Sequence, residues 1–420
     1  MKRELDVYLH NHLVGTLIQD EHGQMLFDYL DSWKSDPAAV PLSHSLPLTR
    51  THSNKNECRG FFAGILPEQN KRELVAKNLG ISARNDYAML ERIGGECAGA
   101  VTFVPAGTEL PGGRAKYRAL TAKELADILR ELPKRPLLAG DAEVRLSLAG
   151  AQDKIAVHAS GTQISMPLDG AMSTHILKPA IQHFQNIVFN EALCMQLARS
   201  IGLEAALAQT GKAEDIDYLI VTRYDRTTES PSPDTTEGLA LHRKHQEDFC
   251  QALGIVPENK YQAEGGPTLK QCFDLLREVS TTPAVDLMAL LDAVIFNFLI
   301  GNHDAHGKNF SLLYSGKRIQ FAPLYDLLCT SYYPQLSSKM AMKIGGEYES
   351  SKITVKHFEQ LAQESNLSKP LVRQRVPELA NKILVELPKL APHIPAASEV
   401  AQIITNNCTR VIDKFKAAPS

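Results

Sequence analysis

Short runs in which apolar and polar residues alternate fill much of the first hundred residues, and this period-two pattern predicts β-strands. The expected strands are Glu4–His10, Leu13–Gln19, Gln24–Tyr29 and Val101–Val104. Helical spacing of apolar residues predicts helices over Glu68–Asn78 and Ala83–Ile93. We therefore expect a small strand-rich unit at the start of the chain.

Residues 105–113 are rich in Pro and Gly, which predicts a linker. Thr121 and Glu124 then form a capping-box pattern, which predicts the start of a helix. Short strands follow, with one helix, Ile187–Ile201, before the last of them. These strands are Val144–Leu148, Ile155–His158, Gln163–Ser165, His175–Leu177 and Tyr218–Arg223. The stretch Thr227–Gly238, rich in Ser, Thr, Pro and Asp, predicts an exposed insertion without regular structure.

From Gln246 onward the apolar pattern is mostly helical, with one strand expected at Phe310–Tyr314. The expected helices are Glu247–Leu253, Leu269–Val279, Ala284–Ile300 and Val355–Glu364, with two or three more towards the C-terminus. Strands that precede helices in this way predict the α+β class.

Composition narrows the class of protein. With 420 residues, 44% apolar and 22% charged, the chain can bury a large core. A formal charge of −3 argues against strong binding of nucleic acid by this chain alone, although it could touch DNA beside a basic partner. Seven scattered cysteines without a CxxC pair indicate reduced thiols. Asp292 and Asn297 interrupt the most apolar run, so we expect a buried helix there, no membrane span and a cytoplasmic protein.

The segment from Asn302 to Asn309 carries the strongest chemical signal. Asp304 is followed five residues later by Asn309, which is the spacing of a protein-kinase catalytic loop, and Asp326 follows the next strand-like segment. In such a loop the first Asp accepts the proton of the attacking hydroxyl, while the Asn and the second Asp hold magnesium. The pattern predicts phosphoryl transfer from ATP in a two-lobed protein-kinase-like fold. That fold would have an N-terminal strand-rich subdomain and a helix-rich C-terminal lobe.

Residues before this loop are candidates to bind the nucleotide. Lys178 ends a strand-like segment, which is how a kinase presents a lysine to the phosphates, and Glu191 on the helix that follows is the best candidate to pair with it. Small residues in Leu148-Ala149-Gly150-Ala151-Gln152-Asp153-Lys154 would let backbone amides approach an anion. Backbone groups of Val221, Thr222 and Arg223 are expected at the adenine edge, with Tyr224 over the ring.

Other interpretations remain open. Asp304 could simply cap a turn, and Lys308 and Glu191 could be solvated charges. His303-Asp304 could be the ligand pair of a metal-dependent phosphohydrolase, although further ligands would be needed. The chain could also phosphorylate a small molecule, or it could be a decayed kinase that acts as a DNA-bound co-repressor.

Taken together, the motifs resemble the HipA family of serine/threonine kinases, toxins of bacterial toxin–antitoxin pairs. The likeness runs nearly end to end. It is carried by Ser45–Leu48, Phe61–Pro67, Ile93–Gly95, Gly99–Thr102, Ser147–Lys154, His175–Lys178, Gln246–Gln251, Gly265–Pro267 and Asp304–Asn309.

The resemblance implies a role for each matching residue. Asp304 would be the base, Asn309 and Asp326 the magnesium ligands, and Lys178 the ATP-phosphate lysine. Leu148–Lys154 would be the phosphate loop, with His306 and Lys308 assigned to the same nucleotide site. Ser147 would be the autophosphorylated serine, whose modification ejects the loop.

The resemblance also implies partners and boundaries. It implies a HipB-like helix-turn-helix antitoxin dimer, operator DNA bound through that complex, and an aminoacyl-tRNA synthetase such as glutamyl-tRNA synthetase as the protein substrate. The sequence departs from its relatives at Thr222, Tyr224 and Asp153, which affects adenine and loop contacts. The expected division is an N-terminal subdomain (1–105), a linker and helix (106–140), a nucleotide-binding core (141–225) and a helical lobe with the catalytic loop (226–420).

Overall fold

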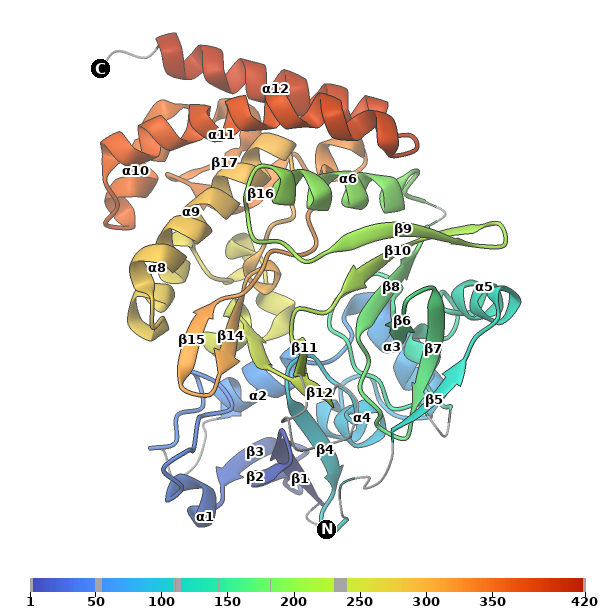
Figure 1. Ribbon diagram of the computed structural model, residues 1–420. Coiled ribbons are helices and arrows are strands. Elements are labelled where there is room, and N and C mark those ends of the chain that lie inside the picture. Colours follow the sequence, from blue (N-terminus) through green and yellow to red (C-terminus); the bar gives the residue numbers. More distant parts are fainter. Residues whose placement is uncertain are drawn as a thin grey trace. The chain divides into compact units, whose positions relative to one another are not determined.

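The computed structural model describes residues 3–49, 55–108, 110, 115–141, 144–181, 183–229 and 240–417. The chain forms two compact units (Figure 1). Unit 1 comprises Met1–Pro179, Gly211–Glu258 and Leu312–Arg318, and unit 2 comprises Ala180–Thr210, Asn259–Ser311 and Ile319–Ser420. The domain boundaries expected from the sequence stay a prediction.

Unit 1 begins with an antiparallel sheet in the order β3-β2-β1-β4. Its strands confirm the four expected near the N-terminus: β1 (Arg3–Leu9), β2 (His12–Gln19), β3 (Met25–Tyr29) and β4 (Val101–Pro105). Alternate residues of β1 are buried, as the period-two pattern requires. The accompanying helices are α1 (Asp31–Lys34), α2 (Lys55–Gly64), α3 (Gln69–Leu79) and α4 (Asp86–Ile93).

Helix α2 was not predicted, because Gly60 and Gly64 lower its helix propensity. Tertiary packing accounts for it. Phe62 of α2 lies 5.3 Å from the Phe27 ring and 5.8 Å from the Phe103 ring, so the helix fills the core beneath the sheet. A Cβ on Gly60 would lie 2.6 Å from the backbone of Gly254, so this close approach requires glycine.

A second sheet of unit 1 has the strand order β5-β7-β6-β8-β10-β9. Its strands are β5 (Lys116–Ala119), β6 (Ile155–Ser160), β7 (Gln163–Leu168), β8 (His175–Pro179), β9 (Ala208–Ala213) and β10 (Ile216–Thr222). Helix α5 (Ala122–Glu131) begins with the predicted capping box of Thr121 and Glu124. β5 and β9 were not predicted from the sequence.

Three sequence predictions for unit 1 need correction. The strand Val144–Leu148 does not form; only Leu146 makes an isolated bridge, to Glu96. The helix expected from Glu247 starts later, because β13 (His245–Asp248) comes first and Asp248 caps α7 (Phe249–Ala252). The first three residues of the expected insertion, 227–229, belong to β11 (Arg226–Glu229), which pairs with β12 (Ala240–Arg243) beyond it, while residues 230–238 lie outside the described residues.

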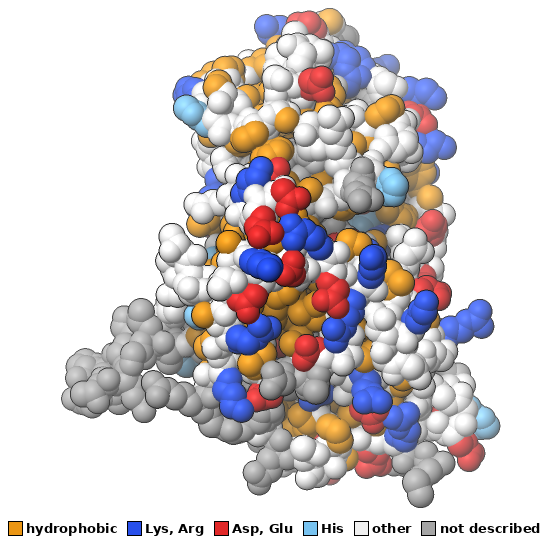
Figure 2. All heavy atoms as spheres, turned by 90° about the vertical axis from the view of Figure 1, so that its right-hand side faces the viewer, with side chains coloured by type: hydrophobic (Ala, Val, Ile, Leu, Met, Phe, Trp, Pro, Cys, Tyr) orange, Lys and Arg blue, Asp and Glu red, His pale blue; other side chains and the backbone are white. Residues whose placement is uncertain are grey.

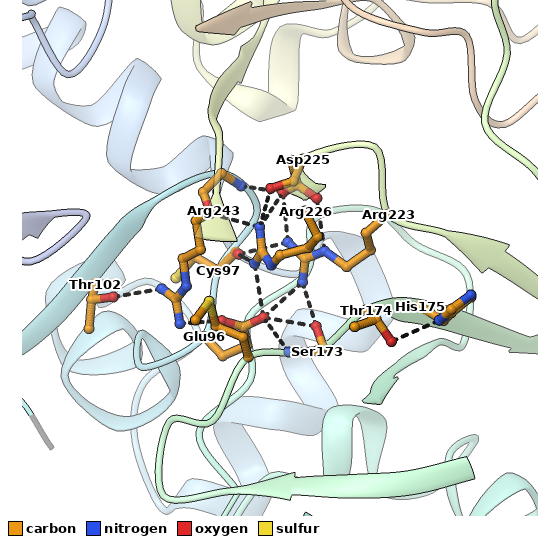
Figure 3. A network of polar contacts seen from close by, with 12 residues as sticks. Glu96, Cys97, Thr102, Ser173, Thr174, His175, Arg223, Asp225, Arg226 and Arg243 are labelled. Atoms are coloured by element: carbon orange, nitrogen blue, oxygen red, sulfur yellow. Dashed lines mark hydrogen bonds and ion pairs between the residues drawn. The ribbon is translucent and has the colours of Figure 1, made fainter. Parts of the chain in front are cut away.

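A buried ion network joins three separate segments of unit 1 (Figure 3). Glu96 Oε1 accepts hydrogen bonds from Arg223 Nη1 at 3.1 Å and Arg226 Nη2 at 2.9 Å. Arg243 pairs with the other oxygen of Glu96 at 2.5 Å. Asp225 Oδ2 accepts from Arg223 Nη2 at 2.8 Å and from the amide of Gly99 at 2.7 Å.

The network keeps its carboxylates ionised. Burial alone would raise the pKa of Glu96, but the guanidinium groups of Arg226, Arg243 and Arg223 outweigh burial and lower the pKa to about 2. The same balance holds the pKa of Asp225 below its ordinary value. Two buried carboxylates thus pair with the buried Arg223 and Arg226 and with the partly buried Arg243. Removing either carboxylate alone would be costly.

Unit 2 is mainly helical, with α11 and α12 packed side by side (Figure 1). Its helices are α6 (Ile187–Ser200), α8 (Leu269–Val279), α9 (Pro283–Ile300), α10 (Val355–Glu364), α11 (Lys369–Leu390) and α12 (Ser398–Ala417). Its short strands are β16 (Lys339–Ile344) and β17 (Glu347–Glu349), with most of β15 (Arg318–Phe321). β14 (Ser311–Ser315), the strand expected at Phe310–Tyr314, lies mostly in unit 1. The strand-rich and helix-rich units confirm the predicted α+β class.

Helix α9 is the one described helix whose length and apolar composition would allow it to cross a membrane. Two-thirds of that stretch, 67%, is buried inside the protein. Its Asp292 forms a bidentate ion pair with Arg375 of α11, at 2.7 and 2.6 Å. These contacts confirm the expected buried helix.

The surface mixes charges of both signs. Figure 2 turns the α5 and β5 side of Figure 1 towards the viewer, and there Lys, Arg, Asp and Glu side chains are interspersed. On α5, Arg130 pairs with Glu214 at 3.0 Å. Where side chains are described on this face, no broad field of one sign appears, in keeping with the net charge.

Replacing Glu96 by Gln should strongly destabilise unit 1, because the arginines keep their charge and lose their partner. We expect a loss of about 3–5 kcal/mol. Urea unfolding followed by the fluorescence of Trp33, the single tryptophan and a residue of unit 1, measures it. Glu131→Gln is the control, because its pair with Arg135 is partly exposed, and it should cost less than about 1 kcal/mol. Equal effects of the two variants would contradict a structural role for the network.

Acid should weaken unit 1 through the same carboxylate. The pKa of Glu96 is lower in the folded state than its ordinary 4.5, so its stabilisation is complete above that pH and is lost as the pH falls towards about 2. Between about pH 6 and about pH 3 the wild type should lose about 2 kcal/mol more than Glu96→Gln. Urea midpoints of both proteins across this range test it, and parallel curves would exclude the linkage.

Candidate active site

The predicted catalytic loop leaves the end of α9 through a glycine. Gly301 has φ +72° and ends the helix in the left-handed conformation. A Cβ at this position would lie 2.4 Å from the Ser331 hydroxyl, so no other residue fits without a shift. The amide of Asn302 then bonds back to the Asn297 carbonyl at 2.8 Å, which reverses the chain.

Neighbouring segments hold this loop at His303. Its amide donates to Thr330 Oγ1 at 2.7 Å, and its carbonyl accepts from the amide of Ala341 at 2.7 Å. All residues from 301 to 310 are buried except Asp304, which is exposed. A fixed backbone therefore presents one carboxylate to solvent, as a base that meets a second molecule requires.

The two predicted magnesium ligands lie together. Asn309 Nδ2 donates to Asp326 Oδ2 at 3.1 Å. Asp326 has φ +58°, a strained conformation for a residue with a side chain, and such strain is often found at functional sites. Tyr325 ties the two segments, because its hydroxyl donates to the Lys308 carbonyl at 2.7 Å.

This pair fits magnesium. Mg²⁺ prefers oxygen ligands and commonly takes one or two from protein, with waters and phosphates completing the shell. Asp326 offers a carboxylate, and rotation of the Asn309 amide would turn its oxygen to the same place. The residues present thus suit a metal that arrives with a nucleotide.

The phosphohydrolase alternative gains no support. His303 Nδ1 contacts the Ser337 carbonyl at 3.2 Å, whereas Asp304 Oδ1 accepts from the Tyr261 hydroxyl at 2.7 Å, so the two side chains have separate partners. Burial lowers the pKa of His303 below its ordinary value. Among the described residues there is no group of three or more His, Cys, Asp or Glu that could hold a metal.

His306 and Lys308, also predicted for the nucleotide site, lie in this buried loop of unit 2, whereas the other predicted nucleotide residues lie in unit 1. Lys178 is 7% exposed and is paired with Leu219, so it lies within β8, one residue beyond the strand expected from sequence. Glu191 lies on α6 in unit 2, and its pairing with Lys178 stays a prediction.

The predicted phosphate loop is folded against α2 and α3. The amide of Glu68 donates to the Gly150 carbonyl at 3.3 Å, and Lys154 Nζ donates to the Ala149 carbonyl at 2.8 Å. Asp153 is paired with Lys71 at 2.6 Å, so this departure from the family has a structural partner. Gly150 has φ +105°, which explains the single glycine of the loop.

Ser147 is completely buried. Its hydroxyl donates to the Ile65 carbonyl at 3.0 Å, and its amide donates to the Glu96 carbonyl at 2.9 Å. A kinase could not reach this hydroxyl in the conformation described. Phosphorylation of Ser147, which stays a prediction, would therefore require the loop to leave first.

The structure gives Arg223, a residue of the predicted adenine edge, several partners within unit 1. Arg223 donates its amide to Thr174 at 2.9 Å, its carbonyl accepts from Arg226, and its side chain is buried among carboxylates. Both backbone groups of Arg223 thus have partners in the protein, and its contact with adenine stays a prediction. Val221 and Thr222 lie in β10, and the Tyr224 hydroxyl bonds to Gln246; their contact with a nucleotide stays a prediction.

Sequence reasoning missed two residues next to the catalytic segments. Tyr261 donates to Asp304, and Asn190 of α6 bonds both backbone groups of Cys329, at 2.8 and 3.0 Å. The available signal for Tyr261 was the Gly265-Gly266 pair four residues later, which indicates a tight turn next to it. Asn190 gave none, because an asparagine within a helix is unremarkable alone.

Comparisons with known proteins agree with this arrangement. The family model described as HipA N-terminal domain matches residues 5–104, and that described as HipA-like C-terminal domain matches residues 146–387. The chain belongs to the HipA family. It is 45% identical over 383 residues, 90% of either chain, to Y4mE of Sinorhizobium fredii, which is named as a candidate kinase.

Another relative of this HipA-family chain has a solved structure. The serine/threonine-protein kinase toxin HipA of Shewanella oneidensis is 28% identical over 405 residues, covering 92% of this chain and 90% of that one. A structure of HipA from that organism, in complex with HipB and operator DNA, matches with a TM-score of 0.84. The match covers 99% of this chain and 100% of the other at 26% identity. The expected family and kinase-like fold are confirmed.

Placing a charge at Ser147 should release the phosphate loop. Ser147→Asp puts a carboxylate where a fully buried hydroxyl lies, and an uncompensated buried charge is too costly to keep. Amide hydrogen exchange of residues 148–154 should therefore rise. Ser160→Asp, at an exposed strand end, is the control and should leave these amides unchanged. Unaltered protection in Ser147→Asp would show that the pocket tolerates the charge.

Proposed function

We propose that this chain is a HipA-type serine/threonine protein kinase, which transfers the γ-phosphoryl group of ATP to a protein hydroxyl. The observation that carries the proposal is the exposed Asp304 on an otherwise buried loop, with the Asn309–Asp326 pair in the same unit. Similarity to the kinase toxin HipA of Shewanella oneidensis supports it.

The reaction follows from the proposed roles. The acceptor oxygen forms a new bond to the γ-phosphorus, the bond from that phosphorus to the β-phosphate oxygen breaks, and ADP leaves. Asp304 accepts the hydroxyl proton. Lys178 and the amides of the loop from Leu148 to Lys154 orient the phosphates. Magnesium, when bound by Asn309 and Asp326, would neutralise phosphate charge. Positioning and charge balance supply most of the rate, because the transition state is loose.

The proposed biological setting is a toxin–antitoxin pair in the cytoplasm. We infer a HipB-like helix-turn-helix dimer as partner, with operator DNA bound through that dimer. The support is the likeness to a HipA whose solved complex contains both HipB and operator DNA. An aminoacyl-tRNA synthetase is the proposed protein substrate, its modification arresting growth, and Ser147 the proposed site of self-modification.

Asp304→Asn should strongly lower the rate of transfer and leave binding of Mg-ATP intact, because the amide cannot take the proton yet keeps the shape of the carboxylate. Removing one preorganised group typically raises a barrier by about 2.7–4 kcal/mol, or about 10²–10³-fold in rate. Transfer of label from [γ-³²P]ATP measures the rate, and isothermal titration measures binding. The control is Asp274→Asn, because the Asp274 carboxylate lies in surface ion pairs of α8. This variant should transfer phosphate and bind Mg-ATP as the wild type does.

The same assay separates the alternatives. Undiminished labelling by Asp304→Asn would reject this residue as the base. Label on small metabolites but not on proteins would indicate a small-molecule kinase. If the wild type neither binds Mg-ATP nor transfers phosphate, the decayed co-repressor is the better interpretation.

A further inference from the structure

Tyr261 touches the proposed base directly. Its hydroxyl donates a hydrogen bond to Asp304 Oδ1 at 2.7 Å, and both residues belong to unit 2. A hydrogen bond to an ionised carboxylate is stronger than one between neutral groups and has a defined direction. Asp304 is exposed, and this contact restrains the rotation of its carboxylate.

The ring of Tyr261 is itself fixed against the catalytic loop. It meets the ring of His306 edge-on, with centroids 5.2 Å apart and an interplanar angle of 80°. The ammonium group of Lys260 lies 5.5 Å from its centroid. Edge-to-face and cation–π contacts of this kind favour one ring orientation. The hydroxyl is therefore held at Asp304 by contacts other than the bond itself.

The backbone that carries Tyr261 is a tight turn that tolerates little change. Its carbonyl accepts bonds from the amides of Glu264 at 2.9 Å and Gly266 at 2.8 Å. Gly265 has φ +95°, and a Cβ on Gly266 would lie 2.5 Å from the Asn259 carbonyl oxygen. Both glycines are thus required for the turn. The next side chain, Gln262, anchors the turn by accepting from the amide of Lys343 at 2.8 Å.

We propose that Tyr261 is a positioning residue for phosphoryl transfer, which orients the carboxylate of Asp304 towards the acceptor hydroxyl. The inference rests on the proposed function and deepens it. Tyr261 transfers no proton in this role; it restricts the carboxylate to the orientation in which it can receive one. A carboxylate accepts bonds at two oxygens, so a bond at Oδ1 is compatible with proton transfer at the other. Geometric preorganisation of this kind raises the rate of the chemical step without tightening nucleotide binding.

Tyr261→Phe is the direct test, because it removes one hydroxyl and keeps the ring that packs on His306. A hydrogen bond to a charged group contributes enough to predict a fall in kcat of about 10- to 100-fold. The Kd for Mg-ATP, measured by isothermal titration, should stay within about twofold of the wild type. Transfer is followed with [γ-³²P]ATP, using the purified chain itself and heat-treated bacterial lysate as acceptors.

A matched control and a double variant decide how the hydroxyl acts. Tyr332→Phe removes another tyrosine hydroxyl of unit 2 that donates to a carboxylate, Glu399 Oε2 at 2.9 Å, and should leave kcat unchanged. In the Asp304→Asn background, Tyr261→Phe should have no further effect on the residual rate, since both changes remove one function. A merely structural tyrosine would instead lower the melting temperature and the residual rate in both backgrounds.

The outcomes separate this inference from the proposed function. An active wild type with an equally active Tyr261→Phe overturns the positioning role and leaves the kinase intact. A weaker Kd for Mg-ATP together with a lower melting temperature also overturns it. No transfer and no Mg-ATP binding by the wild type rejects the kinase itself.

Discussion

Unit 1 depends on the balance of charge around Glu96. Charges removed from water must be paired, and Glu96 and Asp225 pair with Arg223, Arg226 and Arg243 where almost no solvent reaches. Glu96 also accepts hydrogen bonds from the amide and hydroxyl of Ser173, two residues before β8 begins. The ions thus connect the first sheet of the chain to the strands that carry Lys178 and the proposed adenine edge.

This connection lies within one compact unit, which contains the first hundred residues together with β8 and β10. Loss of the carboxylates would leave the arginines after β10 with uncompensated buried charge. The phosphate loop depends on the same region, because the carbonyl of Glu96 accepts the amide of Ser147. A displacement of that loop would therefore break a hydrogen bond to Glu96.

In unit 2 the proposed base, Asp304, is exposed, in contrast to the buried carboxylates of unit 1. Asp304 is left exposed while the backbone around it is fixed by Gly301, Thr330 and Ala341. Asp326 has a strained backbone conformation, and the residue before it, Tyr325, is held by the hydrogen bond from its hydroxyl to the Lys308 carbonyl. Breaking the buried network would destabilise unit 1, whereas the exposed carboxylate of Asp304 in unit 2 is the proposed base.

The sequence by itself determined the family, the α+β class, most helices and strands, and the acids at kinase spacing, because these follow from local periodicity and short motifs. The sequence did not predict α2, because its glycines lower the helix propensity and packing fixes the helix. It also did not predict the ion network, in which Glu96 and Arg223 lie more than a hundred residues apart in the chain. It also gave Tyr261 no role. Only the tertiary structure decided these points, because pairing of buried charges and contact with a catalytic side chain depend on distance in space.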